Sequence, residues 1–217
     1  MNIRDIKKLL TPFFVEQGFV GVNRNRIFIK DRGYYLIAAE IQPCHNIGFF
    51  LNIGVRFLWT RHDGISFDYT YKGLRVYGQE NPNMTLGAIL YDNPEFDNEI
   101  IHMKQGIQKK IEIYEKFEDI HFLEIMIEDQ NNRSNLINND FLNRNIHLAI
   151  AYMLLNKKEE AVTILEHSAE QNSVARQLVE FCEDREGFYK ELLNIINEVR
   201  KRISEKLKIN LSNITGI

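Results

Sequence analysis

The stretch FFLNIGVRFLW, residues 49–59, decides the fold of this chain. Successive side chains of an extended strand point to opposite faces, so alternate residues share one face. One face is entirely apolar, and it comprises Phe49, Leu51, Ile53, Val55, Phe57 and Trp59. The other face is mixed, and it comprises Phe50, Asn52, Gly54, Arg56 and Leu58. The pattern predicts an antiparallel strand with its apolar face in a core.

Period-two patterns on both sides of this stretch predict neighbouring strands. Three further strands are expected over residues 26–30, 34–42 and 67–76, because these runs are rich in aromatic and β-branched residues and are bounded by turn residues. Their short connections favour a four-stranded antiparallel meander.

Helices are expected on both sides of this meander in the sequence. Residues 3–17 have apolar side chains at helical spacing, Asn2 can cap the helix, and Pro12 predicts a kink near Leu9. This helix can cover the apolar face of the sheet. Residues 95–128 predict one long helix or two consecutive helices.

The asparagine-rich run DQNNRSNLINND, residues 129–140, is the predicted linker between two domains. Beyond it the pattern is helical, with helices expected near 141–155, 157–170, 173–184 and 186–208. We therefore predict an α+β fold: a sheet domain over 1–128 with an N-terminal helix packed on the four-stranded antiparallel meander, then an all-helical half over 141–217.

Composition argues against several classes of partner. The formal net charge of −3 and the pI of about 6.1 provide no positive field for nucleic acid. The charged N-terminus does not resemble a signal peptide, and no apolar run reaches the length of about 20 residues that a membrane span needs. These features predict a cytoplasmic protein without a membrane partner. Cys44 and Cys182 form no CxxC pair, so we expect both to be buried as small apolar groups.

Common catalytic signatures are absent from the sequence, including GxGxxG, GxxxxGK[ST], HExxH and GxSxG. We therefore predict no catalytic residue, metal or cofactor. An alternative is that Cys44 and His45 meet His62 and Asp63 at one end of the meander, as a metal site or a thiolate–imidazole pair. Ordinary turn chemistry explains the same residues.

The mixed face of the sheet is the main candidate binding surface. A polar ladder across three strands is expected to comprise Glu40, Gln42, Asn52, Arg56, Asp68 and Lys72. If the helix of residues 95–128 leaves this face partly uncovered, it forms a shallow groove in which Arg56 can bind a carboxylate or phosphate. The alternative is an ordinary solvated sheet face.

The helical half contains two further patterns. One tetratricopeptide-like helix pair is indicated by Leu148, Ala149, Tyr152, Ala161 and Leu165. We expect this pair to pack against the final helix or the sheet domain, and the alternative is partner binding in a concave surface. The last helix carries the basic residues Arg200, Lys201, Arg202, Lys206 and Lys208. Complementing the helix dipole explains them, and nucleic-acid binding is the alternative.

The first 125 or so residues resemble the bacterial domain-of-unknown-function family 4304. The resemblance rests on Gln17-Gly18-Phe19, on Arg26-Ile27-Phe28-Ile29, on the strand ending at Gln42 and above all on Phe50-Leu51-Asn52-Ile53-Gly54-Val55. The chain departs from the family at Pro43-Cys44, and the residues after 140 are outside the resemblance. It implies no established activity, but some members occur among immunity proteins and other components of bacterial conflict systems.

Three functional hypotheses follow. The first is a non-enzymatic protein-binding module, of immunity type or regulatory, acting through the mixed sheet face or the helical half. The second is a hydrolase or small-ligand-binding domain centred on Gln42, Asn52 and Arg56. The third is nucleic-acid binding through the basic last helix.

Overall fold

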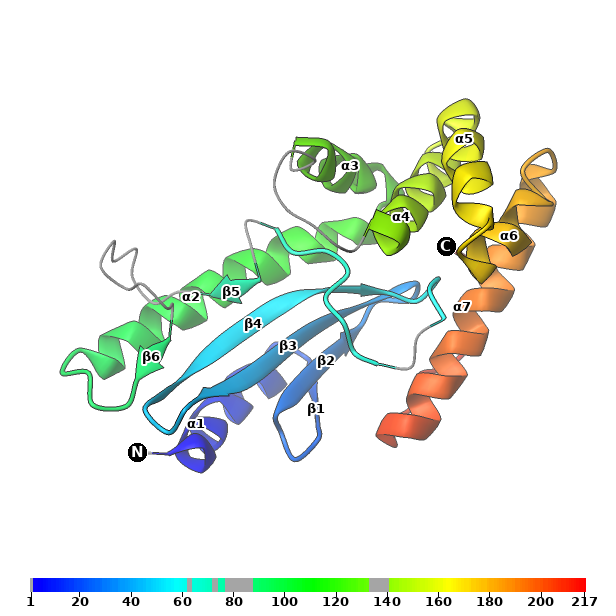
Figure 1. The fold of residues 1–217 in the computed structure, drawn as a ribbon. Coiled ribbons are helices and arrows are strands. Elements are labelled where there is room, and N and C mark those ends of the chain that lie inside the picture. The colour runs from blue at the N-terminus through cyan, green and yellow to red at the C-terminus, as the bar shows by residue number, and fades with distance from the viewer. Residues whose placement is uncertain (1, 62–63, 72–73, 77–87, 133–140) are drawn as a thin grey trace. The chain divides into compact units, whose positions relative to one another are not determined.

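The chain divides into two compact units in a computed structural model that describes residues 2–61, 64–71, 74–76, 88–132 and 141–217 (Figure 1). The first unit comprises Met1–Arg32, Leu36–Arg56 and Ile65–Glu115. The second comprises Gly33–Tyr35, Phe57–Gly64 and Lys116–Ile217. The expected domain boundary stays a prediction, although residues 129–132 of the expected linker belong to a helix.

A six-stranded antiparallel sheet forms the centre of the first unit. Its strands are β1 (Val20–Val22), β2 (Ile27–Asp31), β3 (Tyr35–Cys44), β4 (Gly48–Phe57), β5 (Arg75–Val76) and β6 (Ile89–Leu90). Strands β1 to β5 are neighbours in sequence order, and β6 also pairs with β4. In the β2–β3 pair Phe28 lies opposite Ala39. The predicted α+β class with an antiparallel sheet is thus confirmed, and β1 is a strand that the sequence pattern did not reveal.

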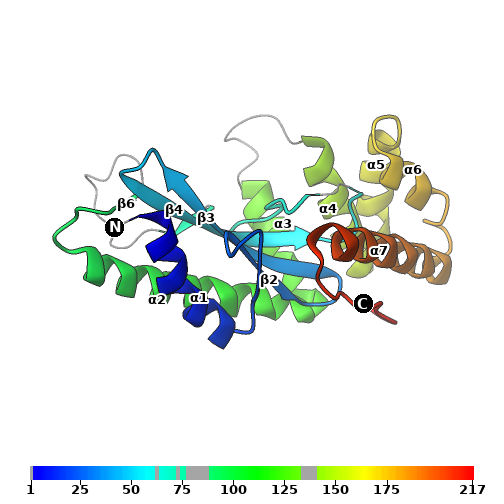
Figure 2. The same ribbon diagram turned by 90° about the horizontal axis from the view of Figure 1, so that it is seen from below.

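Two helices cover the apolar face of the sheet, as Figures 1 and 2 show: α1 (Ile3–Glu16) and α2 (Phe96–Glu115). The ring of Phe14 on α1 stacks on Phe28 of β2, with a centroid distance of 4.2 Å. From α2, the Tyr114 hydroxyl reaches the Ile53 carbonyl of β4 at 3.4 Å. The prediction that the first helix covers the apolar face is confirmed, and the bend expected near Leu9 stays a prediction.

The prediction of a fourth strand over residues 67–76 is wrong for most of the described residues in that range. Among the described residues of this range, regular pairing is limited to β5, whose Val76 lies opposite Leu51, and to an isolated bridge between Tyr69 and Val55. The carbonyl of Val55 accepts hydrogen bonds from both Asp68 N at 2.8 Å and Tyr69 N at 3.1 Å. Two donors on one acceptor interrupt the alternation that a regular antiparallel ladder requires.

The second unit is mainly helical, as predicted. After two short 3₁₀ turns, Lys116–Glu118 and Ile120–Phe122, its helices are α3 (Leu123–Asn132), α4 (Phe141–Leu154), α5 (Lys158–Ala169), α6 (Ser173–Val179) and α7 (Arg185–Leu207). Helices α4 and α5 pack against each other, and α6 continues from α5 (Figure 1). Of the small residues in the expected helix pair, Ala149 and Ala161 are fully buried, which lets two helices approach closely.

Stacked aromatic rings form part of the core of the second unit. Trp59 stacks on Phe57 at 4.4 Å and on Tyr34 at 5.4 Å between ring centroids. Its indole nitrogen donates a hydrogen bond to Nδ1 of His147 at 2.8 Å, and the Tyr34 hydroxyl donates to the Phe117 carbonyl. Burial raises the pKa of Tyr34 well above its ordinary value, because a phenolate would lack solvation there. Trp59 is the single tryptophan, so its fluorescence reports on this unit.

Candidate functional site: a basic cleft at the first helix

Two of the six residues predicted to line an open groove are buried inside the first unit. Arg56 has no exposed surface and Asn52 retains 2%. Arg56 donates to the Asp68 carboxylate at 2.8 Å, and Asn52 Nδ2 donates to Gln42 Oε1 at 3.0 Å. The accessible groove expected around these two residues is therefore wrong. The Arg56 guanidinium and the Asn52 amide nitrogen thus bond within the protein, while the buried Asn52 Oδ1 has no hydrogen-bond partner among the described residues.

The cause is the chain segment that follows β4. A Cβ atom added to Gly54 would lie 2.8 Å from the Tyr69 carbonyl oxygen and 2.9 Å from Thr70 Cγ2. Glycine therefore allows residues 67–70 to lie directly over the mixed face, and this brings Asp68 to Arg56. Ser66 Oγ also donates to Asp68 Oδ1 at 2.5 Å. Residues expected to form a fourth strand instead close the face.

The other residues of the expected ladder are separated from that buried pair. Glu40 is half-buried and pairs with Arg26 at 3.2 Å, while Gln42 is half-buried beside Asn52. Lys72 lies outside the described residues. The assignment of a binding role to the ladder thus stays a prediction for Glu40, Gln42, Asn52, Arg56, Asp68 and Lys72. Of these residues, Asn52 and Arg56 have almost no exposed surface.

The alternative cluster of Cys44, His45, His62 and Asp63 stays a prediction. His62 and Asp63 lie outside the described residues, and His45 is exposed. Cys44 and Cys182 are both free and buried, as expected for small apolar groups. Among the residues that the structure describes, no group of three His, Cys, Asp or Glu side chains could hold a metal ion.

One of the five basic residues predicted on the last helix is also in the interior. Arg200 is 2% exposed, whereas Lys201, Arg202, Lys206 and Lys208 are exposed. Arg202 pairs with Glu198 one helical turn earlier. No helix in the part of the chain described here is long and apolar enough to cross a membrane.

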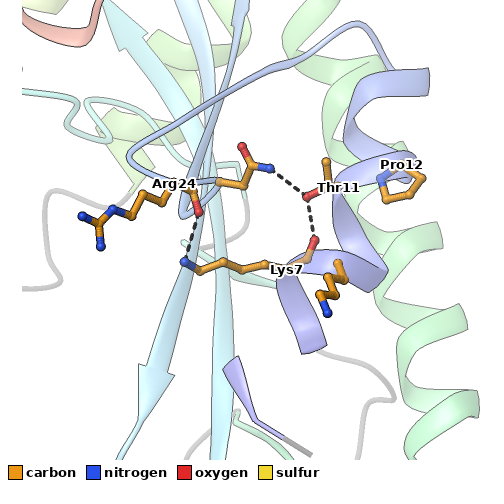
Figure 3. Close-up of a pocket in the computed structure, with 6 residues that line it drawn as sticks. Lys7, Thr11, Pro12 and Arg24 are labelled. Atoms are coloured by element: carbon orange, nitrogen blue, oxygen red, sulfur yellow. Dashed lines mark hydrogen bonds between the residues drawn. The ribbon is translucent and has the colours of Figure 1, made fainter. Parts of the chain in front are cut away.

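A basic cleft between α1 and the β1–β2 turn is the candidate functional site (Figure 3). Its volume is about 310 Å³. Six residues line it: Lys7, Lys8, Thr11, Pro12, Arg24 and Asn25. Three of them are cations and two can form neutral hydrogen bonds. No acidic side chain is in this lining, so the cleft is suited to an anion.

Helix α1 contributes four of these residues. Asn2 and Asp5 form a capping box that fixes the start of the helix. Lys7 and Thr11 are four residues apart and so share one face, and Thr11 Oγ1 donates to the Lys7 carbonyl at 2.6 Å. Pro12 has no N–H, so the helical bond that residue 12 would donate to the Lys8 carbonyl cannot form. The cleft thus borders a locally weakened turn of α1.

The opposite wall is a left-handed turn between β1 and β2. Asn23, Arg24 and Asn25 have φ values of 49°, 55° and 57°. Asparagine tolerates this conformation better than most residues, but arginine gains no such local compensation. Non-glycine residues held in this region often occur at ligand clamps. Arg24 therefore occupies a costly position in which its side chain is exposed.

Hydrogen bonds join the two walls. Lys7 Nζ donates to the Arg24 carbonyl at 3.0 Å, and Asn25 Nδ2 donates to Thr11 Oγ1 at 3.3 Å (Figure 3). A Cβ on Gly21 would lie 2.3 Å from Asn25 Oδ1, so glycine in β1 leaves room for the Asn25 side chain. These bonds hold Lys7, Thr11 and Asn25 in place, while the Arg24 guanidinium extends away from α1 in Figure 3 and is exposed.

Several cations elsewhere in the first unit pair with carboxylates, although Arg4 and Lys109 do not among the described residues. Arg26 pairs with Glu40, Arg56 with Asp68, and both Lys30 and Arg32 with Glu115. Within the described residues, Lys7, Lys8 and Arg24 form no ion pair with a carboxylate. An external anion can therefore interact with them without first displacing a carboxylate of the described residues.

Comparison with family models, with curated proteins and with solved structures found no match for this chain. The resemblance to family 4304 accordingly stays a prediction. The sequence analysis did not predict the cleft, because the residues of its walls showed only the patterns of a helix and a turn and no pattern of a binding site. The one local signal was the run Asn23-Arg24-Asn25 before β2, whose asparagines favour a left-handed turn.

Proposed function

We propose that this chain is a non-enzymatic binding protein that holds an acidic segment of a partner protein in the cleft between α1 and the β1–β2 turn. The supporting observation is the set of three cations, Lys7, Lys8 and Arg24, that line one cleft and have no carboxylate partner among the described residues. The three cations lie together in a chain whose formal net charge is −3, so the local charge of the cleft is opposite in sign to that of the whole chain. Such local complementarity gives specificity and a fast encounter with a negative partner.

A protein partner fits the cleft better than nucleic acid does. Nucleic-acid grooves combine a long basic track with aromatic side chains on which bases stack. The lining of this cleft contains neither a fourth cation nor an aromatic residue. Thr11 and Asn25 instead provide short-range hydrogen-bonding groups of the kind that accompany carboxylates at protein interfaces.

The cellular setting is part of the same proposal. The immunity-type or regulatory role comes from the family resemblance, and we propose a cytoplasmic location with it. An immunity-type protein acts by binding and needs no catalytic residues. A cleft that is pre-arranged by hydrogen bonds and open to an acidic segment is consistent with that role.

Charge reversal at the edges of the cleft tests the proposal. The variant K8E/R24E changes two exposed cations, and K109E/K190E makes the same change in net charge at exposed positions outside the cleft. The probe is a fluorescein-labelled peptide rich in Glu and Ser, measured by fluorescence polarisation at low and physiological salt. Two ion pairs at about 0.5–1 kcal/mol each predict binding weaker by roughly five- to thirtyfold for K8E/R24E.

Equal weakening by the control variant would contradict the proposal, because net charge alone would then explain binding. A single-stranded oligothymidine of matched charge is the second probe. If it binds more tightly than the peptide and depends on the same two residues, the site is a nucleic-acid site instead. A partner captured from a lysate supports the proposal only when K8E/R24E fails to retain it.

A further inference from the structure

Residues 209–217 run along α7 as a non-helical segment, all within the second unit. Helix α7 ends at Leu207, and Lys208 turns the chain in a left-handed conformation with φ of 56°. Leu211 is then buried and Ile214 half-buried. The chain therefore folds back onto the helix that it has just left.

Three polar side chains of α7 bond to the backbone of this segment. Asn197 Nδ2 donates to the Ile214 carbonyl at 3.0 Å, and Asn197 Oδ1 accepts from Ile214 N at 2.9 Å. Ser204 Oγ accepts from Leu211 N at 3.0 Å. Arg200 Nε donates to the Ser212 carbonyl at 2.6 Å, and its NH1 donates to the Gly33 carbonyl. The amide of Asn197 thus pairs with one residue of the segment as a neighbouring β-strand would.

The spacing of these bonds shows that the segment is extended and antiparallel to α7. Leu211 bonds to Ser204 and Ile214 to Asn197, so the segment advances as the helix numbering falls. Seven helical residues cover about 10.5 Å at 1.5 Å each. Three residues of chain cover about 10 Å only when they are nearly fully extended.

Such recognition depends on the backbone of the bound segment and on two apolar side chains, three residues apart. The side chains of Ser212 and Asn213, which lie between them, are exposed and form no hydrogen bond with α7 among the described residues. Asn197 and Arg200 lie on a rigid helix, and Arg200 is 2% exposed. In peptide recognition of this kind, backbone hydrogen bonds give affinity and pockets for particular side chains give specificity.

We propose that Asn197, Arg200 and Ser204 form a peptide-binding groove on α7, that residues 209–214 occupy it within the chain, and that an extended segment of a partner protein replaces them. The partner segment has the pattern apolar-x-x-apolar, as in Leu211-Ser-Asn-Ile214. This groove is separate from the basic cleft, and its ligand is recognised by backbone hydrogen bonds and apolar contacts. Residues 209–214 then regulate access to it.

Loosening the internal segment tests this inference. The full chain carrying L211S/I214S is titrated with a fluorescein-labelled peptide of residues 209–217, measured by polarisation. We expect it to bind the peptide at least about tenfold more tightly than the unaltered chain does. The added peptide competes with residues 209–214 for the groove, and weakening the internal binding of these residues by about 1.4 kcal/mol makes the apparent affinity for the peptide tenfold higher. The matched control S212A/N213A changes exposed positions of the same segment and should leave peptide binding as in the unaltered chain.

Asn197→Ala in the loosened background should weaken peptide binding at least about tenfold, since the two bonds to the backbone of residue 214 are lost. A peptide with serine in place of both apolar residues should not bind. Equal binding by the loosened and unaltered chains, or no effect of Asn197→Ala, overturns the proposal.

Two further measurements keep the test decisive. If Trp59 fluorescence shows that L211S/I214S is unfolded, Ile214→Thr alone is used, and the same order of affinities is expected. Sedimentation of the unaltered chain at the concentrations of the binding assay detects exchange of residues 209–217 between two copies. A dimer that Asn197→Ala dissociates would replace the heterologous partner with a second copy and so overturn the proposal.

Discussion

Arg56 in the first unit and Arg200 in the second are both buried, but their bonds go to different kinds of group. Arg56 pairs with the Asp68 carboxylate at 2.8 Å, a residue twelve positions away. Arg200 donates to the carbonyls of Ser212 and Gly33, the second of which is far away in the sequence. The first arginine fixes a local covering segment on β4, whereas the second joins distant parts of its unit. The same side chain therefore serves local closure in one unit and long-range attachment in the other.

The two arginines also differ in what would be exposed if the bonds were broken. Burial lowers the pKa of the Arg56 guanidinium, and the charge and hydrogen bond of Asp68 offset part of that effect. Removing Arg56 leaves a nearly buried carboxylate, with 7% of its side chain exposed. Removing Arg200 leaves neutral carbonyl groups, and Ser212 lies in an exposed stretch of chain. A stranded charge costs more than a stranded carbonyl.

The largest effect is expected for Arg56→Met. We expect it to lower the free energy of unfolding by about 3–5 kcal/mol, because Asp68 is left as an uncompensated buried charge. Urea denaturation followed by far-UV circular dichroism measures the change. The double variant R56M/D68L should recover most of that loss, since a buried pair replaced by apolar residues is often neutral. A double variant as unstable as the single one would show that shape, not charge, determines the cost.

Arg200→Met is expected to cost about 2–3 kcal/mol, because the carbonyls of Ser212 and Gly33 lose donors from a charged group. Unfolding is followed by the fluorescence of Trp59, the single tryptophan, which lies in the same unit. Hydrogen exchange should also become faster at the amides of residues 209–214. A loss greater than that of Arg56→Met would reverse the comparison between the two buried arginines.

Glu115→Gln should lower stability by about 1 kcal/mol at neutral pH, because Glu115 accepts hydrogen bonds from both Lys30 and Arg32 on partly exposed side chains. Partial burial raises the pKa of Glu115, but the hydrogen bonds and charges of those two residues outweigh it, so the pKa lies below its ordinary value. Its contribution to stability is thus present above the ordinary carboxyl pKa and is lost as pH falls through the lowered one. The difference between the two proteins in urea denaturation should therefore shrink in acid. A difference that is constant from neutral pH into acid would exclude the ion pairs as its cause.

Arg24→Gly is expected to have the smallest effect and the opposite sign, an increase of about 0.5–1 kcal/mol. Glycine adopts φ of 55° without the steric cost that arginine has there, although it also makes the unfolded chain more flexible. Thermal unfolding measures the gain, with Lys8→Ser as a control that should be near neutral. Unchanged or lower stability would show that Arg24 is held by interactions worth more than the strain of its backbone.

The sequence anticipated the elements whose side chains alternate or repeat over a long run. The two faces of residues 49–59 predicted β4, and the spacing of apolar residues predicted α1 and the helices of the second unit. The pattern failed for residues 67–76, where Phe67, Tyr69 and Tyr71 alternate as they would in a strand. Contacts of Asp68 and Tyr69 with β4 outweighed that local preference, because strand propensity depends on the surroundings.

The candidate sites were less accessible to sequence reasoning. Arg56 and Arg200 look like surface residues in a linear pattern, and only their partners, Asp68 in one case and the Ser212 and Gly33 carbonyls in the other, explain their burial. The basic cleft joins Lys7 and Arg24, which are seventeen positions apart and lie on different elements. Neither position belongs to a motif with a fixed spacing.

By itself, the sequence determined the long helices, the strand β4 and the apolar face of that strand, because those properties repeat with the period of the local backbone. The tertiary structure alone decided which polar residues are enclosed and which remain available to a ligand. A charged side chain is buried or exposed according to whether folding brings it a partner. Arg56 pairs with Asp68, whereas Lys8 and Arg24 have no such carboxylate partner among the described residues. Both outcomes depend on tertiary contacts that no local period encodes.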